Sequence, residues 1–320
     1  MKKNKIKDTG LEVTELSFGT SSLGSMPDTY GYEVPEQRAQ ETLKRFFQGP
    51  VNMLDTSRNY AMGESEKRIG IAIKENGGWP ENFILSTKID RNMETLVLDK
   101  KRTRESIEES LKTLNVDSVD ILFLHDPEYV KDVNDVTKKD GALDELFKIK
   151  EEGLAKAVGL AMGKINIMFP ILKNWDFDVI INHNRYTLLN READEMYSYA
   201  HSKNISIFNA APYAGGVLAK GPSNFKKITY QDVTEEKLAP AREIEKVCKK
   251  YNVEMGAAAL QFSMKDKRIT STLCGVTSVQ SIEKNLSWAQ TSIPEKFWNE
   301  LLKLPFSTKD PESERIFTPG

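Results

Sequence analysis

The sequence predicts a (β/α)8 barrel that takes up residues 1–320 as a single domain. Short apolar segments typical of buried strands alternate with segments that have helical spacing of apolar residues, and the alternation runs through eight cycles. No change in composition divides the chain. This alternation is typical of parallel sheets covered by helices. A doubly wound sheet with a second domain is the alternative that alternation alone leaves open.

The individual elements follow from hydrophobic periodicity. Strands are expected at residues 15–18, 52–54, 83–88, 120–125, 155–160, 179–182, 206–209 and 270–274, and helices at 36–47, 65–75, 103–114, 143–152, 167–173, 193–203, 239–251 and 279–289. Residues 253–264 predict one further helix before the last strand. Gly49, Gly77, Gly153 and Pro170 are expected to stop or break these helices.

Three segments lie outside this alternation. Residues 5–13 read K-I-K-D-T-G-L-E-V and predict a short N-terminal β-hairpin around an Asp-Thr-Gly turn. Residues 127–140 are long for a loop between strand and helix, so we expect them over or beside the face that carries the strand ends. The polar, proline-containing residues 307–320 predict an extended C-terminal tail.

Composition excludes several classes of function. The chain is 39% hydrophobic and 29% charged, and its 45 basic residues are balanced by 47 acidic ones, so no net field attracts nucleic acid or an anionic membrane. No export signal and no apolar stretch near the ~18 residues of a membrane span is visible. Cys248 and Cys274 form no C-x-x-C or Cys/His cluster, which argues against a structural disulfide or zinc site. We therefore expect a cytoplasmic protein; its oligomeric state has no signal in the sequence.

Ionisable side chains stand at the ends of three consecutive predicted strands. Asp55 ends the second strand, with Tyr60 just beyond it, Lys88 ends the third strand and His125 ends the fourth. The site of a barrel lies at the carboxyl ends of its strands, and neighbouring strands are ~4.8 Å apart. These side chains are therefore expected to share one pocket. Taken singly, each also has an ordinary interpretation, such as a turn-capping Asp or a strand-end lysine that reaches water.

Together these four side chains indicate proton transfer at a carbonyl or alcohol. A tyrosine with an ordinary pKa of ~10 is a poor acid or base at neutral pH, but a nearby ammonium lowers that pKa. We expect Lys88 to supply this charge, Asp55 to hold Lys88, and His125 to hydrogen-bond the substrate oxygen. No member of the set is a strong nucleophile, and three histidines in the whole chain argue against a zinc triad.

The motifs around these residues resemble the aldo-keto reductase superfamily over nearly the whole chain. They are L-D-T-S-R-N-Y-A-M-G-E-S-E at 54–66, S-T-K at 86–88, V-D-I-L-F-L-H-D-P at 119–127 and G-V-T-S-V-Q-S-I-E-K-N-L at 275–286. The resemblance implies a TIM barrel that binds a nicotinamide dinucleotide, NAD or NADP, without a Rossmann domain. It also implies a catalytic tetrad of Asp55, Tyr60, Lys88 and His125.

Two further segments, N-R-Y-T-L-L-N at 184–190 and N-A-A-P-Y-A-G-G-V-L-A at 209–219, are similar to the branch that contains D-threo-aldose 1-dehydrogenase and L-galactose dehydrogenase. This similarity implies oxidation of the anomeric hydroxyl of an aldose to a lactone, with Tyr60 as general base. One alternative is an NADPH-dependent reductase of aldehydes or ketones. Another, of a different class, is a cofactor-sensing regulatory subunit.

The resemblance also implies a set of cofactor-binding residues: Gly19, Thr20, Asp55, Ala161, Asn182, His183, Pro212, Tyr213, Gly215, Gly216, Leu218, Gly275, Thr277, Ser278, Ser281, Lys284 and Asn285. The chain departs from the family at the nicotinamide end. Ala161 and Met162 stand where many members have a Ser-Asn pair, Asn182 or His183 replaces a Gln, and Ala210, with Tyr213 nearby, replaces a stacking Tyr.

The segment after the eighth strand bears on the choice of cofactor. Gly275 and Ser281 occupy the places where NADPH-preferring relatives often carry a Lys and an Arg that hold the 2′-phosphate. A phosphate without cationic partners loses its charge-assisted hydrogen bonds. The sequence therefore favours NAD, with Lys284 or the backbone at the helix start as the alternative phosphate ligand. Phe123 and the loops at 24–32, 126–140 and 211–230 are expected to shape the sugar pocket.

Overall fold

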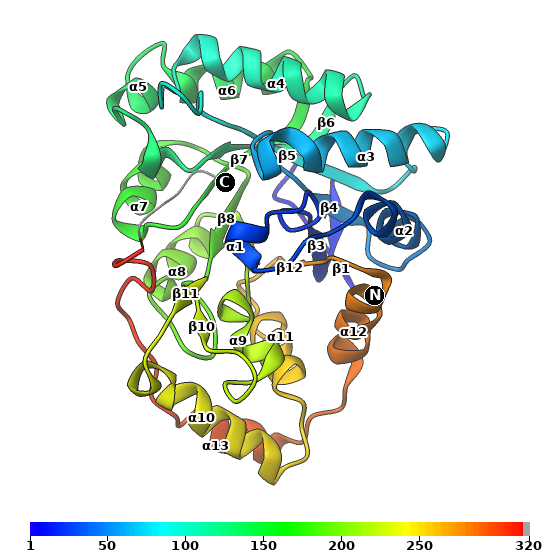
Figure 1. Cartoon of the computed structure of the whole chain (residues 1–320). Helices are drawn as coiled ribbons and strands as arrows, with labels where there is room; N and C mark the ends of the chain where they lie inside the picture. Colours follow the sequence, from blue (N-terminus) through cyan, green and yellow to red (C-terminus); the bar gives the residue numbers. More distant parts are fainter. Residues whose placement is uncertain (316–320) are drawn as a thin grey trace.

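Eight parallel strands form a closed barrel in the computed structural model, which describes residues 1–315 (Figure 1). The strands follow one another around the barrel in chain order, and the last pairs with the first. They are β3 (Leu16–Gly19), β4 (Met53–Asp55), β5 (Ile84–Ile89), β6 (Val119–His125), β7 (Ala155–Met162), β8 (Val179–His183), β9 (Ser206–Ala210) and β12 (Ser271–Gly275). The predicted fold class is confirmed, and each strand begins and ends within two residues of its expected place.

Helices surround the barrel, as Figure 1 shows. The long ones are α2 (Glu36–Phe47), α3 (Glu64–Glu75), α4 (Lys100–Leu114), α6 (Ala142–Glu151), α7 (Ile165–Asn174), α8 (Asp194–Ser202), α10 (Glu235–Lys250), α11 (Met255–Met264) and α12 (Val279–Gln290). Local capping explains several boundaries. The Asp99 carboxylate accepts from the Arg102 amide at 2.8 Å at the start of α4, and Asn115 ends that helix in the left-handed region.

Short helices and a small hairpin complete the loops. They are α1 (Pro27–Tyr30), η1 (Tyr60–Gly63), η2 (Pro127–Tyr129), α5 (Asn134–Thr137), η3 (Ala214–Gly216), α9 (Val217–Lys220), the β10 (Lys227–Ile228) and β11 (Gln231–Asp232) pair, and α13 (Glu295–Leu301). Helix α13 packs beside α10 through Phe297, Trp298 and Leu301, which are buried.

One expected helix break is wrong. Pro170 lies inside α7 and does not end it. A proline inside a helix removes one backbone hydrogen bond, but Met168, Ile171 and Leu172 bury the same helix face against the core. Tertiary packing therefore holds the helix through a residue that would break it in isolation.

The predicted N-terminal hairpin is confirmed, with its strands β1 (Lys3–Lys5) and β2 (Glu12–Thr14) paired antiparallel. Ile6 and Val13 are fully buried and belong to the same cluster as the residues inside the barrel, among them Met53 and Phe123. The hairpin therefore packs onto the barrel interior at the end opposite the carboxyl ends of the strands.

The C-terminal segment is irregular, as expected, but it lies against the barrel. Ser307 bridges to Asn190, and its carbonyl accepts from the Arg191 amide at 2.8 Å. Glu312 is only 4% exposed. Residues 316–320 of the predicted tail lie outside the described residues. None of the helices within residues 1–315 is long and apolar enough to cross a membrane.

Candidate active site

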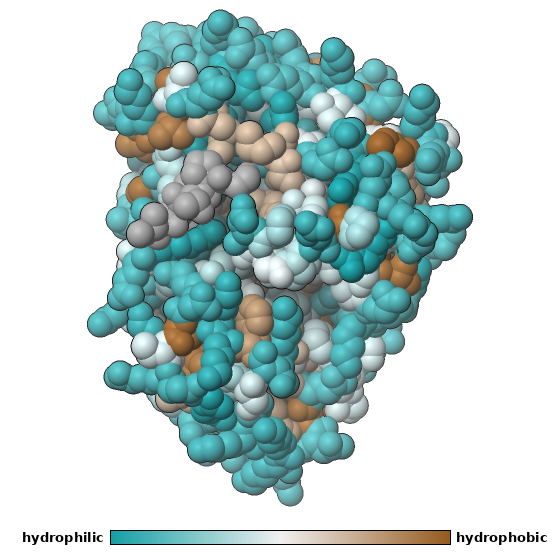
Figure 2. Space-filling model, in the orientation of Figure 1, coloured by the Kyte–Doolittle hydropathy of each residue, from teal (hydrophilic) through white to brown (hydrophobic). Residues whose placement is uncertain are grey.

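A cavity of about 480 Å³ opens at the carboxyl ends of the barrel strands. In Figure 2 the outer surface on this side is mostly hydrophilic, and less polar residues gather toward its centre. The predicted tetrad, Asp55, Tyr60, Lys88 and His125, lines this cavity. Four residues that are up to 70 positions apart in the sequence are thus brought to one site, as the strand-end argument expected.

Asp55 and Lys88 form a buried ion pair. The Lys88 ammonium lies 2.6 Å from Asp55 Oδ2, and both side chains are 2% exposed. The ammonium also donates to the Thr56 carbonyl at 2.6 Å, and Ser86 donates to Asp55 Oδ1 at 2.9 Å. Register explains this meeting, because Asp55 pairs with Ser86 in the β4–β5 ladder and alternate residues of β5 share one face. A buried carboxylate and a buried ammonium satisfy each other here.

Tyr60 lies at the start of η1, directly after the polar turn that follows β4. The Lys88 ammonium is 4.5 Å from the centroid of the Tyr60 ring, and the His125 ring meets it edge to face at a centroid distance of 5.7 Å. The pKa of Tyr60 is raised well above its usual value by burial and by the charge of Asp55. The expected lowering of this pKa by Lys88 is therefore not found, because burial of the phenol and the charge of Asp55 both act in the opposite direction.

His125 lies between two carboxylates. Its Nδ1 is 2.7 Å from Asp90 Oδ1, and its Nε2 is 3.6 Å from Asp126 Oδ1. Burial lowers the pKa of His125, but the charges of Asp126 and Asp90 outweigh burial and raise the pKa above its ordinary value. The imidazole therefore keeps its proton to a higher pH than a free histidine does.

Aromatic residues form the wall nearest the loops. Tyr30, Tyr129 and Tyr230 line the cavity, and the rings of Tyr30 and Tyr230 meet edge to face at 5.7 Å. These residues come from the three loops expected to shape the pocket. Phe123 does not line the cavity, because it points into the barrel interior, where it is fully buried against Phe208.

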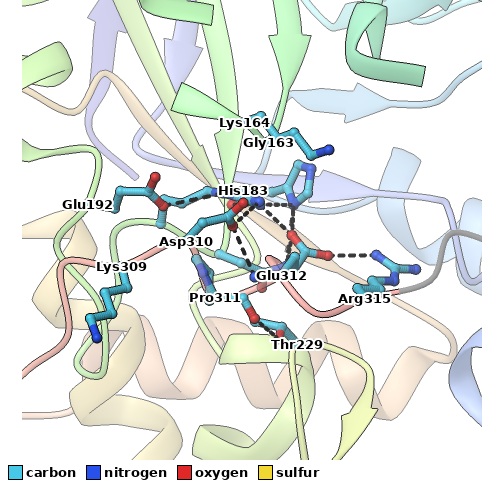
Figure 3. Close-up of polar contacts among 12 residues, drawn as sticks. Gly163, Lys164, His183, Glu192, Thr229, Lys309, Asp310, Pro311, Glu312 and Arg315 are labelled. Atoms are coloured by element: carbon cyan, nitrogen blue, oxygen red, sulfur yellow. Dashed lines mark hydrogen bonds and ion pairs between the residues drawn. The ribbon is translucent and has the colours of Figure 1, made fainter. Parts of the chain in front are cut away.

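Glu312 fixes the C-terminal segment at the cavity mouth. Figure 3 shows its carboxylate reaching toward His183 on one side and Arg315 on the other. Glu312 pairs with Arg185, with Arg315 at 2.6 Å and with His183 Nδ1 at 3.3 Å. Burial opposes its charge, but His183 and Arg185 outweigh burial and hold the pKa of Glu312 far below its usual range. Arg315 and His183 both line the cavity, so this network shapes its rim.

Most of the residues predicted to bind the cofactor lie along the cavity. These are Gly19, Asp55, Ala161, His183, Tyr213, Gly215, Gly216, Gly275, Thr277, Ser281, Lys284 and Asn285. Thr20, Asn182, Pro212, Leu218 and Ser278 do not line it. Asn182 instead donates to the Met162 and Gly163 carbonyls at 2.9 and 2.8 Å, and Leu218 is fully buried. His183 is occupied by Glu312.

Glycines line the cavity end near β12. Gly215 and Gly216 have φ of 74° and 119°, and a Cβ at Gly215 would lie 2.7 Å from the Tyr230 amide. A Cβ at Gly275 would lie 3.9 Å from Ser22 Oγ, so the space beside this glycine is open. The Tyr213 hydroxyl donates to Asn285 Oδ1 at 2.5 Å, which fixes the ring at the cavity wall.

Lys284, on α12, lines the cavity and is the cation that the sequence offered for a cofactor phosphate. Its ammonium is 2.6 Å from Glu254, and both side chains are about half exposed. The first turn of α12 is closed by a capping box, in which Ser278 accepts from the Ser281 amide and Ser281 accepts from the Ser278 amide, both at 3.1 Å. Lys284 is thus neutralised in this structure, and Ser281 is engaged in capping.

Comparison with known proteins places the chain in a family. The model of the aldo/keto reductase family matches residues 15–304. The chain belongs to the aldo/keto reductase family. It is an NAD(P)-dependent oxidoreductase.

Relatives with named activities share a modest part of the sequence. L-galactose dehydrogenase of Arabidopsis thaliana is 31% identical over 292 residues, which cover 88% of this chain and 85% of that protein. D-threo-aldose 1-dehydrogenase of a Pseudomonas species is 26% identical, covering 91% of this chain and 94% of the relative. The structure of an aldo-keto reductase from Bacillus halodurans in its holo form superposes with a TM-score of 0.80 at 21% identity, covering 99% of this chain and all of that one.

Two cavity residues, Asp90 and Arg315, were not predicted. Asp90 contacts His125, and Arg315 reaches the cavity from the C-terminal segment. Asp126, on the other side of His125, belongs to the loop 126–140 that was expected to shape the pocket. A signal for Asp90 does exist in the sequence, because it follows Lys88 by two positions and therefore shares its strand face. Arg315 has no such signal, since nothing in a polar tail indicates where it docks.

Proposed function

We propose that this enzyme oxidises the anomeric hydroxyl of an aldose to the corresponding lactone. The observation that carries the proposal is the convergence of Tyr60, the Asp55–Lys88 pair and His125 on one cavity. The similarity to a galactose dehydrogenase and an aldose dehydrogenase supports a sugar hemiacetal as the substrate. The polar rim of Asp126, Tyr30 and Arg315 suits a ligand with several hydroxyl groups.

In this proposal each residue has a separate role. Tyr60 accepts the proton of the anomeric hydroxyl, and Lys88 lies close enough to its ring to stabilise the phenolate that must form first. Asp55 holds Lys88 in place. His125 hydrogen-bonds the anomeric oxygen and orients the C1 carbon. The bound nicotinamide dinucleotide supplies the hydride acceptor.

The cofactor we propose is NAD. A 2′-phosphate at the start of α12 would have to take Lys284 from Glu254, which is 2.6 Å away. Neither Gly275 nor Ser281 offers a cation. The diol of NAD requires hydrogen bonds only and no cationic partner.

Substitution of Tyr60 by Phe tests the proposed base. We expect kcat for aldose oxidation to fall ~10²–10⁴-fold, which is the usual contribution of a general acid or base. Tyr251→Phe is the matched control, because that hydroxyl binds Glu300 far from the cavity. If Tyr60→Phe keeps turnover within a few-fold, with an unchanged circular dichroism spectrum, then Tyr60 is not the base.

Initial rates across a panel test the substrate and the cofactor. L-fucose, L-galactose, D-arabinose, inositols and pyridoxal would each be offered with NAD⁺ and with NADP⁺, and a set of aldehydes with NADPH. The proposal requires the highest kcat/KM for an aldose with NAD⁺. A clear preference for aldehydes and NADPH would instead establish a carbonyl reductase.

A further inference from the structure

We propose that Asp90 is a positioning residue that holds the His125 ring through Nδ1 and thereby makes Nε2 the nitrogen that exchanges a proton in the cavity. Asp90 lies directly after β5 and His125 ends β6. Ile89 pairs with Leu124 in the ladder between these strands, so the residues that follow, Asp90 and His125, lie side by side. That the substrate is an aldose rests on the proposed function, whereas the contact between Asp90 and His125 is independent of it.

Asp90 is built into the site as a fixed acceptor. Its side chain is 1% exposed, and its Oδ1 is 2.7 Å from His125 Nδ1. Its other oxygen accepts from the Asn59 amide at 3.0 Å and from the Ser57 hydroxyl. Its own amide donates to Ser106 Oγ at 3.0 Å. Both oxygens and the backbone are thus held, so the carboxylate cannot turn away from the ring.

The contact fixes the protonation pattern of His125. Burial raises the pKa of Asp90, but the charge of His125 and the hydrogen bonds that Asp90 accepts outweigh burial and lower this pKa. Asp90 is therefore ionised, and its oxygens can only accept hydrogen bonds. Nδ1 must then carry a hydrogen in both forms of the ring. When the ring is neutral, Nε2 accepts from a substrate hydroxyl; when the ring is protonated, Nε2 donates to a substrate oxygen.

Asp90 is one of several charged groups that face the ring. Asp126 lies on the Nε2 side at 3.6 Å, Lys88 opposes protonation from β5, and the phenol of Tyr60 packs edge to face from η1. Of these charged groups, Asp90 holds Nδ1 at 2.7 Å, and the uncharged Ser57 hydroxyl, which donates to Asp90, lies 3.2 Å from the same nitrogen. Asp126 adds charge, but its distance to Nε2 leaves that nitrogen without a short hydrogen bond among residues 1–315. Substitution of Asp126 therefore tests the effect of charge on His125, and substitution of Asp90 also tests the orientation of its ring.

Titration of the histidine rings by NMR tests the contact without any substrate. The chain has three histidines, so His125→Gln suffices to assign the signals of His125. We expect Asp90→Asn to lower the pKa of His125 by about one unit or more, because a full charge within hydrogen-bond distance is lost. Asp120→Asn is the matched control, since Asp120 lies near the opposite end of β6 and binds Lys156. An unchanged pKa in Asp90→Asn overturns the proposal.

Kinetics test the consequence for the reaction. At a pH above the His125 pKa of both the wild type and the variant, a decrease of that pKa by about one unit lowers the protonated fraction of His125 about tenfold. We expect the pH profile of kcat/KM for reduction of an aromatic aldehyde to move to lower pH in Asp90→Asn, with kcat changing more than KM. Asp90→Ala, which also frees the ring, should lower kcat further.

The two proposals fail in different ways. If the wild-type enzyme oxidises no aldose, the proposed function is wrong, but the NMR titration and the aldehyde profile still decide the role of Asp90. If folded Asp90→Asn and Asp90→Ala variants keep the wild-type pH profile and kcat, Asp90 is only structural and this inference is overturned.

Discussion

The buried pair between Asp55 and Lys88 should make each partner strongly dependent on the other. The perturbation is Lys88→Met, which replaces the ammonium by a side chain of similar length. Among residues 1–315, the Asp55 carboxylate then keeps the Ser86 hydroxyl at 2.9 Å as its one side-chain donor, in a position that is 2% exposed. A carboxylate left without its counter-charge in such surroundings loses most of the interaction that offset its desolvation.

The magnitude follows from this burial. Breaking a buried ion pair on one side costs about 3–5 kcal/mol in the free energy of unfolding. Asp55→Asn should cost a similar amount, because Lys88 then keeps only neutral acceptors, among them the Thr56 carbonyl at 2.6 Å. The double variant Asp55→Asn/Lys88→Met buries no charge at this position. Its cost should therefore be clearly less than the sum of the two single costs.

Urea unfolding of the wild type and the three variants, followed by tryptophan fluorescence, measures the coupling. A coupling energy of at least about 2 kcal/mol is expected for a pair in direct contact. If the single variants each lose less than about 1 kcal/mol, the pair behaves like an exposed salt bridge. Additive costs in the double variant would equally refute the reasoning. Loss of activity alone would not decide the matter, since both residues belong to the proposed site.

Three further predictions concern the edges of the cavity. Glu254→Gln frees Lys284 from its 2.6 Å ion pair, so the KM for NADP⁺ should fall several-fold while that for NAD⁺ stays constant; equal changes for both cofactors would contradict the assignment. Glu312→Gln removes a charge that holds Arg185, Arg315 and His183, so the C-terminal segment should become sensitive to limited proteolysis. Because the folded pKa of Glu312 is lowered, its stabilisation is present above the ordinary pKa of ~4.5 and is lost as pH falls below it. The resistance of the wild-type C-terminal segment to proteolysis should therefore decline as the pH falls below ~4.5, whereas proteolysis of the Glu312→Gln variant should not change with pH in this range. Asp126→Asn removes the charge beside Nε2, so the pKa of His125 measured by NMR should fall; a rise would contradict the electrostatic picture.

The strand ends show how far local pattern determines a site. Asp55, Lys88 and His125 each end a short apolar segment, and parallel strands place such ends on one face of a barrel. Their convergence was predictable because it depends only on strand order and on the two-residue period of side chains. The same two-residue period places Asp90, two positions after Lys88, on the same face as Lys88. Its contact with His125, however, becomes evident only from the register between β5 and β6.

The protonation of Tyr60 shows where pattern fails. The presence of Lys88 in the sequence indicates a lowered pKa, yet in the structure the ammonium is bound to Asp55 and the phenol is buried. A pKa depends on the sum of desolvation and all nearby charges, and that sum is fixed by distances that no local pattern contains.

The sequence by itself determined the barrel, the hairpin and the three strand-end residues Asp55, Lys88 and His125, because these depend on periodicity and chain order. Only the tertiary structure decided where the C-terminal segment brings Arg315 to the cavity and that Lys284 pairs with Glu254. It also decided that α7 continues past Pro170. Each of these depends on which surfaces remain available after the core has packed, and such surfaces are built from residues far apart in the chain.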